Sequence, residues 1–220
     1  MITADQAMNQ LNRAVGAIVR PLGFPGSRGV WTRVTGEGIA AIGTTRSVMS
    51  FQGTVFVQVA IGAVPRSWWE YRNHQAVQRG EPPIAYDASA ATYDIGFVEA
   101  RLRPERAFYH MKMPAGAYRA TTQDEVDHAE ELLTTAAGIL APMAIDLVRP
   151  GRYLAEMRAD PSRGIGFWEP FIVLLADEGP SDELDDAIDE LCAAYAERGA
   201  DRPDDVIAYA RARAADVERG

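Results

Sequence analysis

The spacing of the apolar residues changes along the first third of the chain, and this change restricts the fold more than any other feature. Before Arg20 the apolar residues recur at steps of three and four, the period of one face of an α-helix. The residues of this stripe are Met8, Leu11, Val15, Ile18 and Val19. In residues 54–61, Val55, Val57, Val59 and Ile61 alternate with other residues, the period of a strand with one buried face. The chain is therefore predicted to be an α+β protein.

Three consecutive segments have the composition of strands. Residues 30–35 and 39–49 are separated by the short turn Gly36-Glu-Gly38, and residues 54–61 follow. Short links between successive strands favour an antiparallel meander. Residues 93–103 are predicted as a fourth strand and residues 117–120 as a short fifth. The intervening residues 65–83 are interpreted as irregular, since Pro82-Pro83 interrupts any regular element.

Two capping boxes predict where helices begin. Thr3 with Gln6, and Thr122 with Glu125, have the spacing at which each side chain bonds the other residue's backbone N–H. The second of these helices is predicted to end or kink at Pro142.

Further helices are predicted near the C-terminal end. Three of them are expected at residues 152–157, 171–175 and 203–217, and another begins after the capping residue Ser181. Residues 171–176 also fit a buried strand, but Pro170 suits the first turn of a helix. We therefore expect an N-terminal helix, an antiparallel meander sheet of 4–5 strands, and C-terminal helices packed on it. Residues 1–176 form the α+β domain, and residues 177–220 form an acidic helical extension packed on the same domain.

The charge is concentrated at the C-terminal end. The 220 residues carry a net charge of −9, and residues 177–220 contain 14 acidic and 5 basic side chains, so the whole excess lies there. A neutral body with an acidic end disfavours binding of nucleic acid or of a membrane with anionic lipids. The single cysteine, Cys192, excludes an internal disulfide. With no signal-peptide pattern and no apolar run of membrane length, we expect a cytoplasmic protein.

Several segments occur in a recognisable order. A helix runs into Arg20-Pro-Leu-Gly-Phe24, and Trp31-Thr-Arg33, a hairpin and Phe56-Val-Gln-Val-Ala-Ile-Gly62 follow. The helix capped by Thr122 leads through residues 147–154 to Ile172-Val-Leu-Leu-Ala-Asp-Glu-Gly179, before the acidic helix. This order resembles the DUF4304 family of uncharacterised bacterial proteins, over roughly residues 8–195. The resemblance implies an α+β fold and brings no activity, catalytic residue or cofactor, and residues 67–91 look longer than its pattern needs.

The sequence has no pattern typical of a metal, phosphate or nucleophile site. His74, His110 and His128 are not at helical ligand spacing and do not group with the cysteine, so no zinc site is predicted. The acidic residues 182–190 lack the glycine and alternating ligands of a calcium loop. The glycine pairs Gly36-Glu-Gly38 and Gly164-Ile-Gly166 complete neither a dinucleotide-binding motif nor a Walker motif. We predict no catalytic residues, no metal and no cofactor, and expect that the reactive side chains do not gather in one place.

Two segments contain candidate binding residues. In residues 68–74 aromatic side chains lie beside polar ones, a composition typical of ligand or partner surfaces. The candidates there are Trp68, Trp69, Tyr71, Arg72 and His74. Paired tryptophans beside a sheet are more often part of a core, and the sequence favours that interpretation.

The second segment is residues 149–168, where four arginines precede two aromatic residues. These arginines are Arg149, Arg152, Arg158 and Arg163. They could hold an anion, or they could form ion pairs with the acidic C-terminal helices, which the sequence favours. Arg152, Arg163 and Trp168 remain candidate binding residues.

Two functions are compatible with these features. The favoured one is a non-enzymatic binding protein, of an accessory or immunity-like kind, whose acidic helices contact a basic surface of another protein. The alternative is a small-molecule-binding protein or enzyme with a pocket beside residues 68–74. There His74 would act as acid or base next to Glu70 or Asp94, and Arg72 or an arginine of residues 149–163 would bind an anionic ligand.

Overall fold

A computed structural model describes residues 2–46, 55–82, 86, 118–120, 122–160, 163 and 165–219, and it confirms the α+β fold. The strands are β1 (Gly26–Ser27), β2 (Val30–Val34), β3 (Gly38–Arg46), β4 (Val55–Pro65) and β5 (Tyr118–Ala120). The helices are α1 (Ala4–Val19), α2 (Arg66–Gln78), α5 (Gln123–Leu147), α6 (Arg152–Arg158), α7 (Ile165–Leu175), α8 (Asp182–Ala196) and α9 (Asp204–Arg219). Short 3₁₀ turns follow α1 (η1, Arg20–Leu22) and α7 (η3, Ala176–Glu178).

The strands form one antiparallel sheet in the order β1-β2-β3-β4-β5, so the predicted meander is confirmed. Trp31 pairs with Ile42, and Ile42 pairs with Ile61, which places these apolar residues on one face. The short strand expected at residues 117–120 is present as β5, which pairs with β4. The strand expected at residues 93–103 lies outside the described residues.

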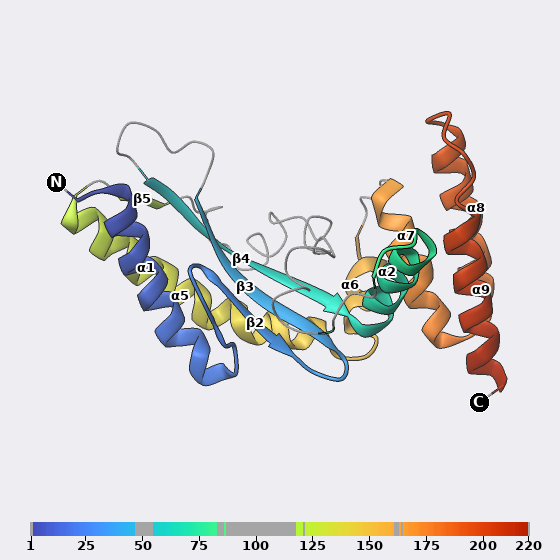
Figure 1. Ribbon diagram of the computed structural model, residues 1–220, viewed down its shortest axis with the longest axis horizontal. Coiled ribbons are helices and arrows are strands. Elements are labelled where there is room, and N and C mark those ends of the chain that lie inside the picture. The colour runs from blue at the N-terminus through green and yellow to red at the C-terminus, as the bar shows by residue number, and fades with distance from the viewer. Residues whose placement is uncertain are drawn as a thin grey trace.

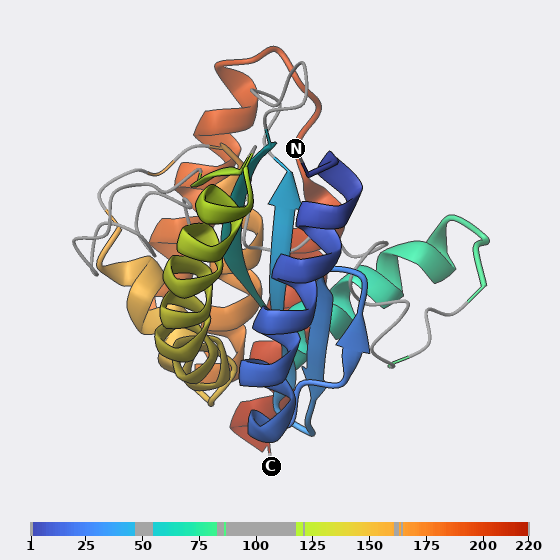
Figure 2. The same cartoon turned by 90° about the vertical axis from the view of Figure 1, so that its left-hand side faces the viewer.

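Helices α1 and α5 lie side by side on this face of the sheet (Figure 2). Both predicted capping boxes are present, at Thr3 and at Thr122. Helix α5 does not end at Pro142 but continues to Leu147, and the proline side of the helix is exposed. The buried stripe of α5, which includes Leu133 and Leu140, packs against α1, β3 and β4. Burial of these side chains is the main favourable contribution to this layer.

The expectation that residues 65–83 are irregular is wrong, because residues 66–78 form helix α2. Its apolar residues do not form a single stripe, so the helical period is weak in the sequence. Tertiary packing stabilises the helix instead, since Trp68, Trp69 and Tyr71 are all buried. An ion pair between Arg66 and Glu70, at 2.8 Å and one turn apart, adds local support.

The remaining helices gather at one end of the strands, far from the N-terminus (Figure 1). Helix α7 confirms the helix expected at residues 171–175, and it is buried between α2, α6, α8 and α9. Helices α8 and α9 are the outermost elements in this region (Figure 1). Within the described residues, no helix taken alone has the length and apolar content of a membrane span; α5 and α6 together would, but they are bent by 99° at their junction.

Candidate functional site

The aromatic residues of α2 are part of the core. The rings of Trp68 and Tyr71 lie 5.4 Å apart, and Tyr71 also contacts Tyr209 of α9 at 5.0 Å. Tyr71 accepts a hydrogen bond from Gln75 at 2.6 Å, and burial raises the pKa of its phenol. Trp69 packs edge-on against Tyr86, with ring centres 4.7 Å apart. These contacts favour the packing interpretation of the segment, since they join α2 to α9 and to Tyr86.

His74 and Arg72 contact aromatic and polar side chains of the same helical region. His74 is exposed, and its ring lies 5.2 Å from that of Tyr209. Arg72 donates to Gln75 at 3.0 Å and lies 6.0 Å from the centre of the Trp68 ring. Glu70 is bound by Arg66 and Arg213, and Asp94 lies outside the described residues. Among the described residues, no hydrogen bond joins His74 to Glu70.

The arginines of the second segment divide between ion pairs and aromatic contacts. Arg158 donates to Glu178 and to Glu183 of α8, each at 2.6 Å, which confirms the expected pairing with the acidic end. Arg152 pairs with Asp146, at the end of α5, at 2.8 Å. Arg163 lies over three aromatic rings, at 5.4 to 5.9 Å from their centres. Those rings belong to Phe167, Trp168 and Phe171.

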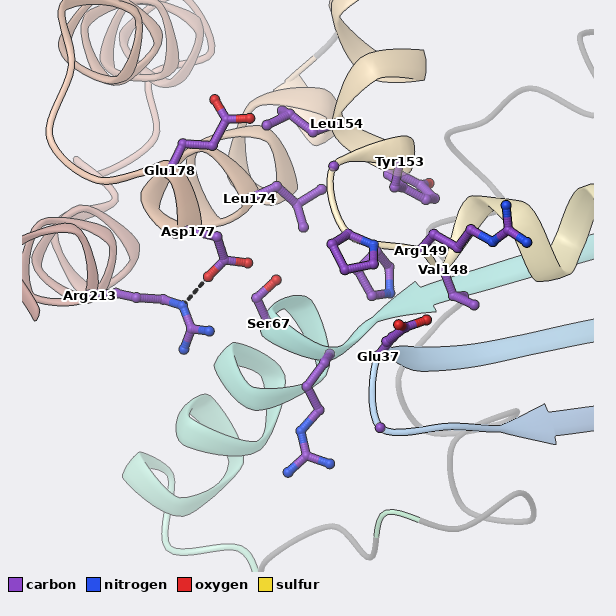
Figure 3. Close-up of a pocket in the computed structure, with 15 residues that line it drawn as sticks. Glu37, Ser67, Val148, Arg149, Tyr153, Leu154, Leu174, Asp177, Glu178 and Arg213 are labelled. Carbon is purple, nitrogen blue, oxygen red and sulfur yellow. Dashed lines mark hydrogen bonds and ion pairs between the residues drawn. The ribbon is translucent and has the colours of Figure 1, made fainter. Parts of the chain in front are cut away.

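A cavity of about 450 Å³ lies where α2 begins (Figure 3). The turn before β3, the start of α2, the link between α5 and α6, η3 and α9 all contribute to its walls. Its ionisable residues are Glu37, Arg66, Arg149, Tyr153, Asp177, Glu178 and Arg213. The expectation that reactive side chains do not gather in one place is therefore wrong. Sequence patterns missed the cavity because its residues come from five separate parts of the chain.

An ion-pair network connects three elements beside this cavity. Arg213 binds Asp177 and also donates to Glu70 at 2.9 Å, and Glu70 in turn binds Arg66. Burial alone would lower the pKa of Arg213, but its hydrogen bond and charge interaction with Asp177 outweigh this and raise it. The hydrogen bond from Arg66 to Glu70 likewise raises the pKa of Arg66. Both guanidiniums therefore stay protonated, and they supply charge and hydrogen bonds rather than protons.

The other prominent polar surface is the outer face of α8. The opposite face of this helix carries a buried stripe that packs on α7. The stripe consists of Leu184, Ala187, Ile188 and Leu191. Asp186, Asp189 and Glu190 are exposed, and within the described residues none of them forms an ion pair. Asp185 has only a 3.6 Å contact with Arg211.

Metal ligands do not cluster in the part of the chain that the structure describes. No group of three or more histidine, cysteine, aspartate or glutamate side chains there is placed to hold a metal ion. Cys192 is half-buried on α8 and is a free thiol. Within the described residues, the cavity at α2 and the acidic face of α8 are two places where charged side chains gather.

Comparisons of the chain with models of known protein families, with curated proteins and with solved structures gave no match. The resemblance to the DUF4304 family stays a prediction. Function must be inferred from the two surfaces just described.

Proposed function

We propose that this chain is a binding protein that contacts a basic surface of a partner protein through the outer face of α8. The observation that carries the proposal is the set of exposed carboxylates at Asp186, Asp189 and Glu190, which have no ion-pair partner among the described residues. Because the opposite face of the helix is anchored on α7, these carboxylates are presented on a fixed support.

The spacing of the acidic residues supports a role in binding. Asp182 and Asp186, and likewise Asp186 and Glu190, are four residues apart on one helix. Like charges at this spacing destabilise a helix by roughly 0.2–0.5 kcal/mol per pair. Only the first turn benefits from the helix dipole, so the later carboxylates have no compensation of that kind. A cationic partner would remove this repulsion on binding.

The distribution of charge supports the same proposal. The net charge of −9 lies wholly in residues 177–220, so the electric field of the molecule points toward one end. Such a field accelerates encounter with a positively charged protein and disfavours acidic ones.

Capture experiments with two matched variants test the proposal. The first variant combines Asp186→Asn, Asp189→Asn and Glu190→Gln. The control combines Asp5→Asn, Asp124→Asn and Glu131→Gln, which changes the net charge equally but lies on α1 and α5. The tagged proteins are expressed in the cells that naturally produce the chain, and stoichiometric partners are quantified by mass spectrometry.

The wild type and the control should retain the same basic partner, and the α8 variant should lose it. Binding by the wild type should also weaken steeply as the salt concentration rises. Equal capture of a partner by all three proteins, or a partner with an acidic surface, would contradict the proposal.

A further inference from the structure

The cavity at the start of α2 combines several hydrogen-bond donors with apolar walls, and it is separate from the acidic face of α8. We propose that it binds a small organic acid, whose carboxylate accepts hydrogen bonds from the first turn of α2 and from the Ser67 hydroxyl. This inference does not depend on the proposed contact through α8.

The first turn of α2 has free donors. Helix geometry leaves its first backbone N–H groups without acceptors in the helix. The N–H of Arg66 is taken by the carbonyl oxygen of Glu37 at 2.9 Å. The preceding residue, Pro65, has no side chain that can cap the helix, and the first turn contains no acidic residue. The N–H groups of Ser67 and Trp68 are therefore available at the positive end of the helix dipole.

The second, independent observation is the side chain of Ser67. It is only 4% exposed, and Figure 3 shows its hydroxyl directed into the cavity, toward the side formed by Leu174 and Asp177. No residue in the described part of the chain forms a hydrogen bond with this hydroxyl. Because this hydroxyl lies on the cavity wall, a ligand oxygen bound there can accept its hydrogen bond.

The rest of the cavity wall determines which kind of acid fits. Pro65, Val148, Pro150, Leu154 and Leu174 present apolar surface on the same cavity. A ligand with a carboxylate at one end and an apolar body would match both parts. A volume of about 450 Å³ lies in the range of small-molecule sites.

The charges of the cavity favour a single negative charge on the ligand. The lining contains three arginines, Arg66, Arg149 and Arg213, but each already binds a carboxylate. Glu37, Asp177 and Glu178 lie on the same walls. A phosphate monoester, which carries nearly two charges, would meet these carboxylates without an unpaired cation to offset them. A carboxylate carries only one negative charge, so its repulsion from these groups is smaller, and the donors at the start of α2 can offset it.

Nuclear magnetic resonance titrations of the full chain test the inference, with octanoate and 4-phenylbutyrate as probes. The comparison compounds are their primary amides, which have the same shape without the charge, and inorganic phosphate. The two carboxylates should shift the amide resonances of Ser67 and Trp68. The primary amides should bind at least about tenfold more weakly, since hydrogen bonds to a charged acceptor are the stronger ones.

Three variants separate this site from nonspecific binding. Ser67→Ala should weaken carboxylate binding about tenfold. Ser67→Asp places a carboxylate of the chain itself at the start of α2, where the ligand carboxylate would bind, so it should abolish binding. Gln78→Asp adds the same charge at the other end of α2 and should leave binding unchanged. Ser67→Ala keeps the test valid even if Ser67→Asp does not fold.

Several outcomes would overturn the inference. One is the absence of any shift with either carboxylate at about 10 mM, a concentration roughly ten times the dissociation constant of even weak fragments. A second is equal affinity for a carboxylate and its amide. Unchanged binding by Ser67→Ala, or tighter binding of phosphate than of the carboxylates, would also overturn it.

Discussion

Arg213 of α9 donates a hydrogen bond to Glu70 of α2 at 2.9 Å, across 143 positions of the sequence. The same guanidinium binds Asp177 of η3, so a single side chain holds the last helix against two other elements. Both Arg213 and Glu70 are about one-third exposed, which puts the pair between the surface and the core. The position of α9 therefore depends on a polar contact as well as on its buried apolar residues.

Replacing Arg213 by methionine tests this contact. Arg213→Met keeps an unbranched side chain of similar length but leaves Glu70 and Asp177 without their shared cation. We expect the free energy of unfolding to fall by about 1–2 kcal/mol, less than for a fully buried pair because solvent screens this one. Urea unfolding followed by circular dichroism measures the change. Arg219→Met is the matched control, since Arg219 is 70% exposed, and it should change stability by less than about 0.5 kcal/mol.

The turn before β3 allows a second test, with two neighbouring glycines. A Cβ atom added to Gly38 would lie 2.6 Å from the carbonyl oxygen of Val64 and 3.0 Å from the Cβ of Val148. Because the first contact is with backbone, Gly38→Ala must displace β4, and we expect a loss of about 1–3 kcal/mol. Gly36→Ala should be nearly neutral, since no atom lies within 4 Å of its added Cβ. Equal unfolding midpoints for the two variants would contradict the register of β3 and β4.

The pair between Arg158 and Glu183 predicts a pH dependence. The hydrogen bond from Arg158 lowers the pKa of Glu183 below its ordinary value of 4.5. A lowered pKa in the folded state stabilises the protein above the unfolded pKa, and this stabilisation is lost as the pH falls through the folded value. Arg158→Met should therefore reduce the free energy of unfolding more at pH 7 than at about pH 3.

Denaturant unfolding of the wild type and Arg158→Met at several pH values measures this difference. In a background that carries Glu183→Gln, the pH dependence of the Arg158→Met effect should become smaller, because one of the two carboxylates bound by Arg158 is gone. A constant difference across the pH range would show that the pair does not contribute through the charge of Glu183.

Local sequence signals predicted most of the elements. The side chains of Thr3, Thr122 and Ser181 each accept the backbone N–H three residues later, as their sequence context indicates. These caps involve residues close in sequence, so a short window contains all the information. The pairing of β2 with β3 was predictable for the same reason, since only residues 35–37 separate the two strands.

Long-range contacts explain what sequence patterns missed. Helix α2 has no clear apolar stripe, and its burial depends on Tyr209 and Tyr86, which are distant in sequence. The cavity brings Glu37 and Arg213 to the same walls, and no periodicity relates these two positions. Ser67 carried no signal at all, because a lone serine acquires meaning only from the burial of its hydroxyl.

Strand β4 passes directly into α2, with Pro65 as both the last residue of the strand and the N-cap of the helix. Because no loop intervenes, the end of β4 fixes the rotation of α2 about its own axis. Successive residues of a helix differ by about 100° around that axis. One residue inserted at this junction would swing Trp68 and Tyr71 away from the interior and turn the Ser67 hydroxyl out of the cavity. The number of residues at the junction of β4 and α2, more than their identity, thus determines which side of α2 faces the interior.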